Sequence, residues 1–281
     1  MLKRILTAAV ALPIVVFLLW LNNPLVIMIA MTLVSVLSVA EVLIATKYFS
    51  NRGLTAVCMV FVAALPSFLY FEEIIRFFPM LAGTFLLVLF LIMLYDHKNV
   101  KFQEISLMTF VAFLIPISLS TVFFLHKMGK HGLFYVILAF LIPWISDAGA
   151  YFVGSALGKH KMAPNISPKK SWEGFFGGIV AAIVSVLVVG FGYPWAESLL
   201  NGSADFMVNI WLLVVVAIVG SVLGVIGDFS ASLLKRQCEV KDFGSILPGH
   251  GGILDRFDSM LFAAPFLYFV FSIIEPVINI A

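Results

Sequence analysis

The feature that most constrains this chain is a series of uninterrupted apolar runs, each about as long as a bilayer is thick. Backbone polar groups in hydrocarbon must be satisfied within the protein, which a helix achieves along its own length. Only 11% of the residues are charged, against roughly 25% in soluble domains, so a water-soluble fold is excluded. Strands of a membrane barrel would alternate apolar and polar residues, and these runs do not. The sequence therefore predicts an all-α, polytopic membrane protein.

Hydropathy read over a window of about 19 residues indicates roughly nine membrane spans. The predicted spans are Ile5–Leu21, Pro24–Thr46, Leu54–Phe71, Phe78–Tyr95, Glu104–Leu125, Leu133–Gly154, Gly174–Gly192, Asn209–Asp228 and Phe257–Ile274. The first run follows Lys3 and Arg4 and resembles a signal peptide, but no small-residue cleavage site follows it. We therefore expect it to be retained as the first transmembrane helix.

The distribution of lysine and arginine predicts the orientation of the chain. With a cytoplasmic N-terminus and alternating spans, only Arg76, Lys127 and Lys130 of the 17 basic residues fall outside. Because positive residues favour cytoplasmic loops, the N-terminus is expected inside and the C-terminus outside. We expect a multi-pass protein of the cell (inner) membrane, in contact with membrane lipids and with its polar site facing the cytoplasm.

The polar residues are unevenly distributed between the two halves of the chain. Residues 1–132 contain apolar spans and short loops without a group of reactive side chains. Residues 133–281 add two longer loops that are rich in Gly, Pro, Lys, Asp and Ser. We therefore divide the chain into N-terminal transmembrane helices, residues 1–132, and a catalytic transmembrane region, residues 133–281.

The first of these loops contains a candidate phosphate site. The segment Ser167-Pro168-Lys169-Lys170-Ser171 leads into a predicted helix, whose first backbone N–H groups would attract an anion beside the two ammonium groups. The same lysines could simply mark the cytoplasmic side, next to anionic lipid headgroups. Asp147 and Asp228 are harder to explain in that way, because an ionisable residue in a span needs a polar cavity or a partner. Glu41 has no comparable polar neighbours in sequence and could contact another helix or the interface.

The strongest signal is the run from Ser232 to Asp258. Several cations precede a glycine-rich turn around His250, and two carboxylates, Asp255 and Asp258, follow it. On a helix, residues three apart share a face, so both carboxylates could approach one hard cation or bridge two. Arg256 could bind phosphate, and the glycines allow the backbone to approach a ligand closely. An interfacial basic helix would explain the cations but not the aspartates. Metal, cations and an ordered loop are what phosphoryl or nucleotidyl transfer requires.

In these residues the chain resembles the phosphatidate cytidylyltransferase family, the CDP-diacylglycerol synthases. The family signature is matched without a break by Ser232, Lys235-Arg236, Lys241-Asp242, Pro248-Gly249-His250-Gly251-Gly252 and Asp255-Arg256-Phe257-Asp258. Ser146-Asp147, Ala150-Tyr151-Phe152 and the segment from Ser167 to Gly174 are also similar to that family. The resemblance covers roughly the last half of the chain.

The resemblance implies an enzyme that makes CDP-diacylglycerol and pyrophosphate from CTP and phosphatidate in phospholipid biosynthesis. It also implies Mg²⁺, with K⁺ as a companion, and a homodimer; no nucleic-acid partner is expected. The expected metal ligands are Asp147, Asp228, Asp255 and Asp258. The expected catalytic residues are Lys235, Arg236, Lys241, Asp242, His250 and Arg256. The expected substrate-binding residues are Ser167, Lys169, Lys170, Ser171, Ser232, Gly249, Gly251 and Gly252. His250 could instead stabilise its turn through a hydrogen bond.

Two other functions fit parts of the sequence. A transporter could use Asp147 and Asp228 along an ion path, but its polar residues should lie near the middle of the membrane rather than at one face. A related membrane transferase could use another nucleotide or another lipid phosphate, such as a polyprenol phosphate. A structural scaffold in the membrane would not need the aspartates.

Overall fold

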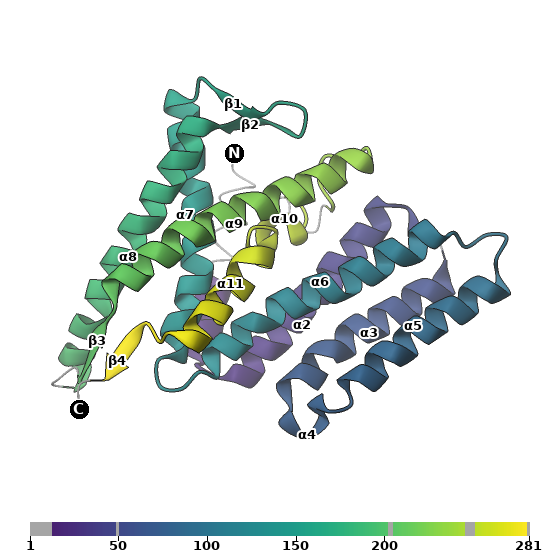
Figure 1. The fold of residues 1–281 in the computed structure, drawn as a ribbon, viewed down its shortest axis with the longest axis horizontal. Helices are drawn as coiled ribbons and strands as arrows, with labels where there is room; N and C mark the ends of the chain where they lie inside the picture. Colours follow the sequence, from purple (N-terminus) through teal and green to yellow (C-terminus); the bar gives the residue numbers. More distant parts are fainter. Residues whose placement is uncertain (1–12, 49–50, 202–204, 245–250, 280–281) are drawn as a thin grey trace. The chain divides into compact units, whose positions relative to one another are not determined.

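A computed structural model describes residues 13–48, 51–201, 205–244 and 251–279 (Figure 1). Its helices are α2 (Pro24–Ala45), α3 (Arg52–Tyr70), α4 (Glu72–Ile75), α5 (Phe78–Tyr95), α6 (Phe102–His126), α7 (Gly132–Leu157), α8 (Trp172–Asn201), α9 (Ile210–Gln237), α10 (Leu254–Phe257) and α11 (Met260–Ile273). Its strands are β1 (Lys161–Ala163), β2 (Ser167–Ser171), β3 (Phe206–Val208) and β4 (Val277–Asn279).

The predicted all-α, polytopic membrane fold is confirmed. In the described part of the chain, 8 helical segments are long and apolar enough to cross a membrane, with α10 and α11 counted as one segment. Residues 13–20 are also helical and belong to the first predicted span, whose beginning lies outside the described residues. The chain is therefore an integral membrane protein.

The chain forms two compact units. Unit 1 comprises residues 1–124 and 234–257, and unit 2 comprises residues 125–233 and 258–281. The chain passes from unit 2 to unit 1 near the end of α9 and returns between Phe257 and Asp258. The signature is thus divided between the two units.

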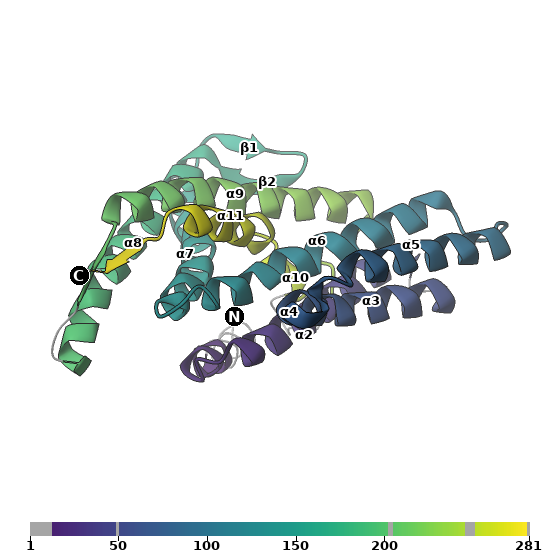
Figure 2. The ribbon, with the colours of Figure 1, turned by 60° about the horizontal axis from the view of Figure 1, so that its bottom comes forward.

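Unit 1 is built on a group of antiparallel helices. The helix α3 packs against both α2 and α5, which Figures 1 and 2 show beside it. The Phe61 ring stacks on Phe85 with 4.0 Å between centroids, and both rings contact Phe113. The side chains of Asn23 and Asn51 accept hydrogen bonds from the first turns of α2 and α3, as is usual at helix starts. Apolar packing between the helices, with polar caps at their ends, therefore defines this unit.

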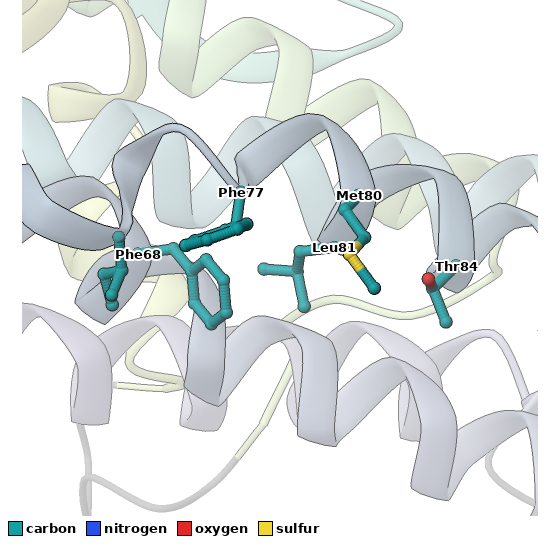
Figure 3. Close-up of a pocket in the computed structure, with 6 residues that line it drawn as sticks. Phe68, Phe77, Met80, Leu81 and Thr84 are labelled. Carbon is teal, nitrogen blue, oxygen red and sulfur yellow. The ribbon is translucent and has the colours of Figure 1, made fainter.

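An apolar groove of about 350 Å³ lies between α3, α4 and α5 (Figure 3). Its lining consists of Phe68, Ile74, Phe77, Met80, Leu81 and Thr84. Thr84 contributes the only polar side chain of this lining, so the groove offers no ionisable group for chemistry.

Unit 2 is organised by close packing of α7 against α8. Glycines allow this approach: a Cβ on Gly149 would lie 2.5 Å from that of Ala181, and one on Gly178 would lie 2.6 Å from the Ser146 carbonyl oxygen. The antiparallel hairpin β1–β2 connects the two helices, and Figures 1 and 2 show it at one end of the pair. At the other end of α8, β3 pairs with β4.

Candidate active site

The end of α9 differs from the sequence prediction. The predicted span ended at Asp228, whereas the helix continues to Gln237 and presents Ser232, Lys235 and Arg236 on helical turns. Several residues in this segment, including Leu233, Leu234 and Gln237, have good helix propensity, so the helix does not need to stop where the apolar run ends. The signature therefore begins on an ordered helix rather than in a loop.

In unit 1, Lys235 forms a buried ion pair with Asp255. The Lys235 Nζ lies 2.6 Å from Asp255 Oδ1, and the two side chains are only 12% and 6% exposed. The other carboxylate oxygen, Oδ2, accepts hydrogen bonds from the backbone N–H groups of Gly252 at 2.9 Å and Phe243 at 3.3 Å. Gly251 has a φ of 82°, a conformation that glycine adopts without strain. Lys235 and Asp255 thus hold the end of α9 and the glycine-rich segment together.

Glu41, which the sequence left without an assigned role, also contacts this segment. Its carboxylate accepts hydrogen bonds from the backbone N–H groups of Ile253, at 2.9 Å, and Leu254, at 3.1 Å. The only sign of this in the sequence was an ionisable residue inside an apolar span, which usually marks a functional or interhelical contact.

Asp255 and Asp258 do not lie on one continuous helix, in contrast to the expected shared helical face. The short helix α10 ends at Phe257, and Asp258 lies in the turn before α11. The boundary between the two units falls at this break, so Asp255 belongs to unit 1 and Asp258 to unit 2.

In unit 2, Asp147 and Asp258 meet at the hydroxyl group of Ser259. The Ser259 Oγ donates to Asp147 Oδ2 at 2.7 Å and lies 3.4 Å from Asp258 Oδ1, which also accepts from the Ser259 backbone N–H at 2.8 Å. Ser259 and Asp258 are buried. We call Asp147 and Asp258 the carboxylate pair. Ser259 was missed by the sequence analysis, although it directly follows the signature.

Unit 2 also contains an ion pair, which joins a predicted substrate-binding residue to a predicted metal ligand. Lys170 Nζ, on β2, lies 2.5 Å from Asp228 Oδ2, on α9, and 4.5 Å from the centre of the Phe229 ring. The other carboxylate oxygen of Asp228 accepts from the hydroxyl of Ser232 at 3.2 Å. Residues predicted for phosphate, metal and substrate are therefore in direct contact here.

The predicted phosphate turn is instead the strand β2. Ser167 pairs with Ala163, Lys169 is exposed, and Ser171 is buried with its hydroxyl oxygen accepting from the Gly174 N–H at 3.2 Å. Ser171 therefore caps the start of α8. Glu173 contacts His160 across the hairpin, with 2.6 Å between Oε1 and Nδ1.

The remaining predicted residues are distributed as follows. Arg236 is on α9, Arg256 is on α10, and Lys241 and Asp242 lie in the irregular segment between these helices. Gly249 and His250 lie outside the described residues. The roles assigned to all these residues stay predictions.

The predicted metal ligands do not gather into one cluster. Within the ranges that the structure describes, no three His, Cys, Asp or Glu side chains are grouped so that they could hold a metal ion. Magnesium, however, is usually bound through one or two protein carboxylates together with substrate phosphates. Two carboxylate oxygens that converge on one hydroxyl, as in the carboxylate pair, fit that requirement.

Comparison with known proteins identifies the family. The family model described as "Cytidylyltransferase family" matches residues 2–274. A phosphatidate cytidylyltransferase of Bacillus subtilis (strain 168) is 38% identical over 228 residues, which cover 81% of each chain. One from Staphylococcus epidermidis is 36% identical over 267 residues, covering 94% of this chain and 96% of the relative. One from Staphylococcus aureus (strain COL) is 35% identical with the same coverage.

These matches extend through the N-terminal helices, where the sequence alone had suggested no resemblance beyond membrane helices. The similarity thus includes the segments that contribute Glu41, Asp147 and the signature. The chain belongs to the phosphatidate cytidylyltransferase family and is a nucleotidyltransferase.

Proposed function

We propose that this enzyme transfers a cytidylyl group from CTP to phosphatidate, forming CDP-diacylglycerol and pyrophosphate in phospholipid biosynthesis. The names of its relatives support this substrate pair. The structural observation that carries the proposal is the meeting of Asp147 and Asp258 at the Ser259 hydroxyl. Two carboxylates that converge in this way suit a divalent cation, which nucleotidyl transfer needs.

In the proposed reaction, a phosphate oxygen of phosphatidate attacks the α-phosphorus of CTP in line. The bond from the α-phosphorus to the bridging oxygen breaks, and pyrophosphate leaves with the electron pair. The attacking phosphate monoester is already anionic near neutral pH, so no strong general base is required. The main barrier is the repulsion between two anions, which positioned cations and correct alignment reduce.

The proposed cofactor is Mg²⁺, held by the carboxylate pair, with K⁺ as a companion. Bound Mg²⁺ would neutralise phosphate charge on the nucleotide. Asp228 and Asp255 remain proposed as further ligands; each is paired with a lysine, Lys170 and Lys235 respectively. These lysines, with Arg236, Lys241 and Arg256, are proposed to bind the substrate phosphates.

We further propose that the site faces the cytoplasm from the inner membrane, where soluble CTP and a laterally diffusing lipid can meet. The positive-inside distribution of basic residues supports this orientation. A homodimer is proposed on the basis of the family resemblance alone.

The test is transfer of label from α-labelled CTP to a chloroform-soluble product by detergent-purified protein with phosphatidate and Mg²⁺. Label in the lipid should require phosphatidate and should be lost in Asp258→Asn. Parallel reactions with other nucleotides and with a polyprenol phosphate would reveal a different transferase. Folded wild-type protein that transfers no label from any nucleotide would contradict the proposal.

A further inference from the structure

Glu41 is a buried acidic residue that the proposed reaction does not use. It lies on α2 and is only 2% exposed. Its two carboxylate oxygens accept separately, Oε1 from the N–H of Ile253 and Oε2 from the N–H of Leu254. Leu254 begins α10, and the first N–H groups of a helix have no acceptor within that helix. A side chain from the second membrane helix therefore supplies acceptors to a segment more than 200 residues later in the chain.

Two glycines of the same region fit around this carboxylate. A Cβ on Gly252 would lie 2.5 Å from Glu41 Oε2, and a Cβ on Gly244 would collide with Oε1. Neither glycine has a positive φ, so the reason for glycine at these positions is space rather than backbone conformation. The backbone of unit 1 thus encloses the Glu41 carboxylate on two sides.

The contact leads directly to Asp255. The N–H of Gly252 donates to Asp255, and the next two N–H groups, of Ile253 and Leu254, donate to Glu41. Three consecutive backbone amides are therefore held by two carboxylates, and Lys235 fixes the second oxygen of Asp255. Loss of Glu41 would leave two of these amides without their carboxylate acceptor.

We propose that Glu41 is a positioning residue for the signature, which fixes the backbone of Ile253 and Leu254 and thereby the placement of Asp255. This inference rests on the proposed function, because Asp255 is one of its assigned groups. Glutamine cannot replace Glu41, because its amide has one acceptor oxygen and would present N–H groups to a backbone donor. Since Glu41 acts through Asp255 rather than on substrate, its removal should lower kcat more than it raises KM.

The first test compares Glu41→Gln with Glu104→Gln, which removes another buried glutamate, on α6. In Glu41→Gln, kcat should fall by about 10- to 100-fold, since small misplacements of catalytic groups have effects of that size. KM for CTP should stay near the wild-type value, and Glu104→Gln should keep the wild-type kcat. A wild-type kcat in folded Glu41→Gln would overturn the proposal.

Hydrogen exchange separates this inference from the proposed function, because it needs no substrate. The amides of Ile253 and Leu254 should exchange faster in Glu41→Gln than in wild type or Glu104→Gln. If these amides lose protection in Glu41→Gln and the wild-type protein transfers no cytidylyl group, the Glu41 contact is real and the proposed function is wrong. Unchanged protection of the Ile253 and Leu254 amides in Glu41→Gln would contradict the positioning role, whatever reaction the enzyme catalyses.

A third variant approaches the contact from the opposite side. Gly244→Ala should push against the Glu41 carboxylate and lower kcat as Glu41→Gln does, while Gly83→Ala should not, because nothing lies within 4 Å of a Cβ at Gly83. If Glu41→Gln fails to fold, Gly244→Ala decides the question. Wild-type kcat and amide protection in Gly244→Ala would then overturn the proposal.

Discussion

At the scale of single residues, several charges of the candidate site are arranged as partly buried ion pairs. Lys235 is joined to Asp255, and Lys170 is joined to Asp228, so two of the four carboxylates that were expected to bind metal have a lysine within contact distance. Buried ion pairs contribute little net stability compared with apolar side chains, because both charges lose their hydration. Their presence here fits the proposed function, in which these lysines and carboxylates would exchange partners with substrate phosphate and metal.

Removal of one partner should nevertheless be costly. Lys235→Ala leaves the Asp255 charge buried without its lysine, which should lower the free energy of unfolding by about 3–5 kcal/mol. Thermal unfolding in detergent measures this effect. The control is Lys169→Ala, which removes an exposed lysine next to Lys170. It should change the free energy of unfolding by less than about 0.5 kcal/mol. Equal unfolding temperatures for the two variants would show that the Lys235–Asp255 contact is unimportant for the fold.

The carboxylate pair predicts the magnesium dependence of the activity. Chelation of divalent metal should abolish transfer, and addition of Mg²⁺ should restore it. Asp147→Asn should raise the Mg²⁺ concentration for half-maximal activity by about tenfold or more, because one anionic ligand of the carboxylate pair is lost. Asp205→Asn, an exposed carboxylate before β3, is the control and should leave the titration curve unchanged. A wild-type titration curve for Asp147→Asn would remove Asp147 from the metal site.

At the scale of secondary structure, close helix packing positions the residues of unit 2. Asp147 lies on α7 among the small residues that face α8, where Gly149, Gly177 and Gly178 allow the two backbones to approach. Helix association in a membrane relies on such close packing, because lipid is as apolar as the helix surfaces. The distance between the carboxylate pair and the β1–β2 hairpin therefore depends on glycines, which have no reactive side chain.

A single methyl group should disturb this packing. Gly178→Ala places a Cβ 2.6 Å from the Ser146 carbonyl oxygen, one residue before Asp147, and should destabilise the protein by about 1–3 kcal/mol. Gly192→Ala on the same helix meets nothing within 4 Å and should be neutral or slightly stabilising. Thermal unfolding and transfer activity of the pair provide the measurement. Identical behaviour of the two variants would mean that α7 and α8 do not need this close approach.

At the scale of the whole molecule, the topology still rests on the positive-inside prediction. The segments before and after α6 are predicted to lie on opposite sides of the membrane, because this helix of 25 residues is long enough to span it. Exposed lysines mark both segments: Lys98 before the helix and Lys127 after it.

Cysteine labelling in intact cells can check this orientation. In a background with Cys58 and Cys238 replaced by serine, Lys98→Cys should be protected from a membrane-impermeant maleimide and Lys127→Cys should react. The native thiols need replacement although Cys58 is buried and burial raises the pKa of Cys238. The reverse labelling pattern would invert the topology and place the polar site outside the cytoplasm.

The sequence by itself determined the fold class, the approximate spans and the family, because each is encoded locally. Apolar run length identifies a membrane helix without knowledge of its neighbours, and the signature residues are contiguous along the chain. Helix ends were less predictable: α9 continues past Asp228 because residues of good helix propensity, including Leu233, Leu234 and Gln237, follow it.

Only the tertiary structure decided which residues contact one another. Lys170 with Asp228 and Glu41 with Ile253 are pairs from distant segments, and hydropathy or spacing carries no information about such contacts. Asp255 and Asp258 show the converse, because their sequence spacing suggested one helical face and a helix break separates them. The physical reason is that chemistry in a membrane requires each buried charge to find a partner, and the packing of the helices selects that partner.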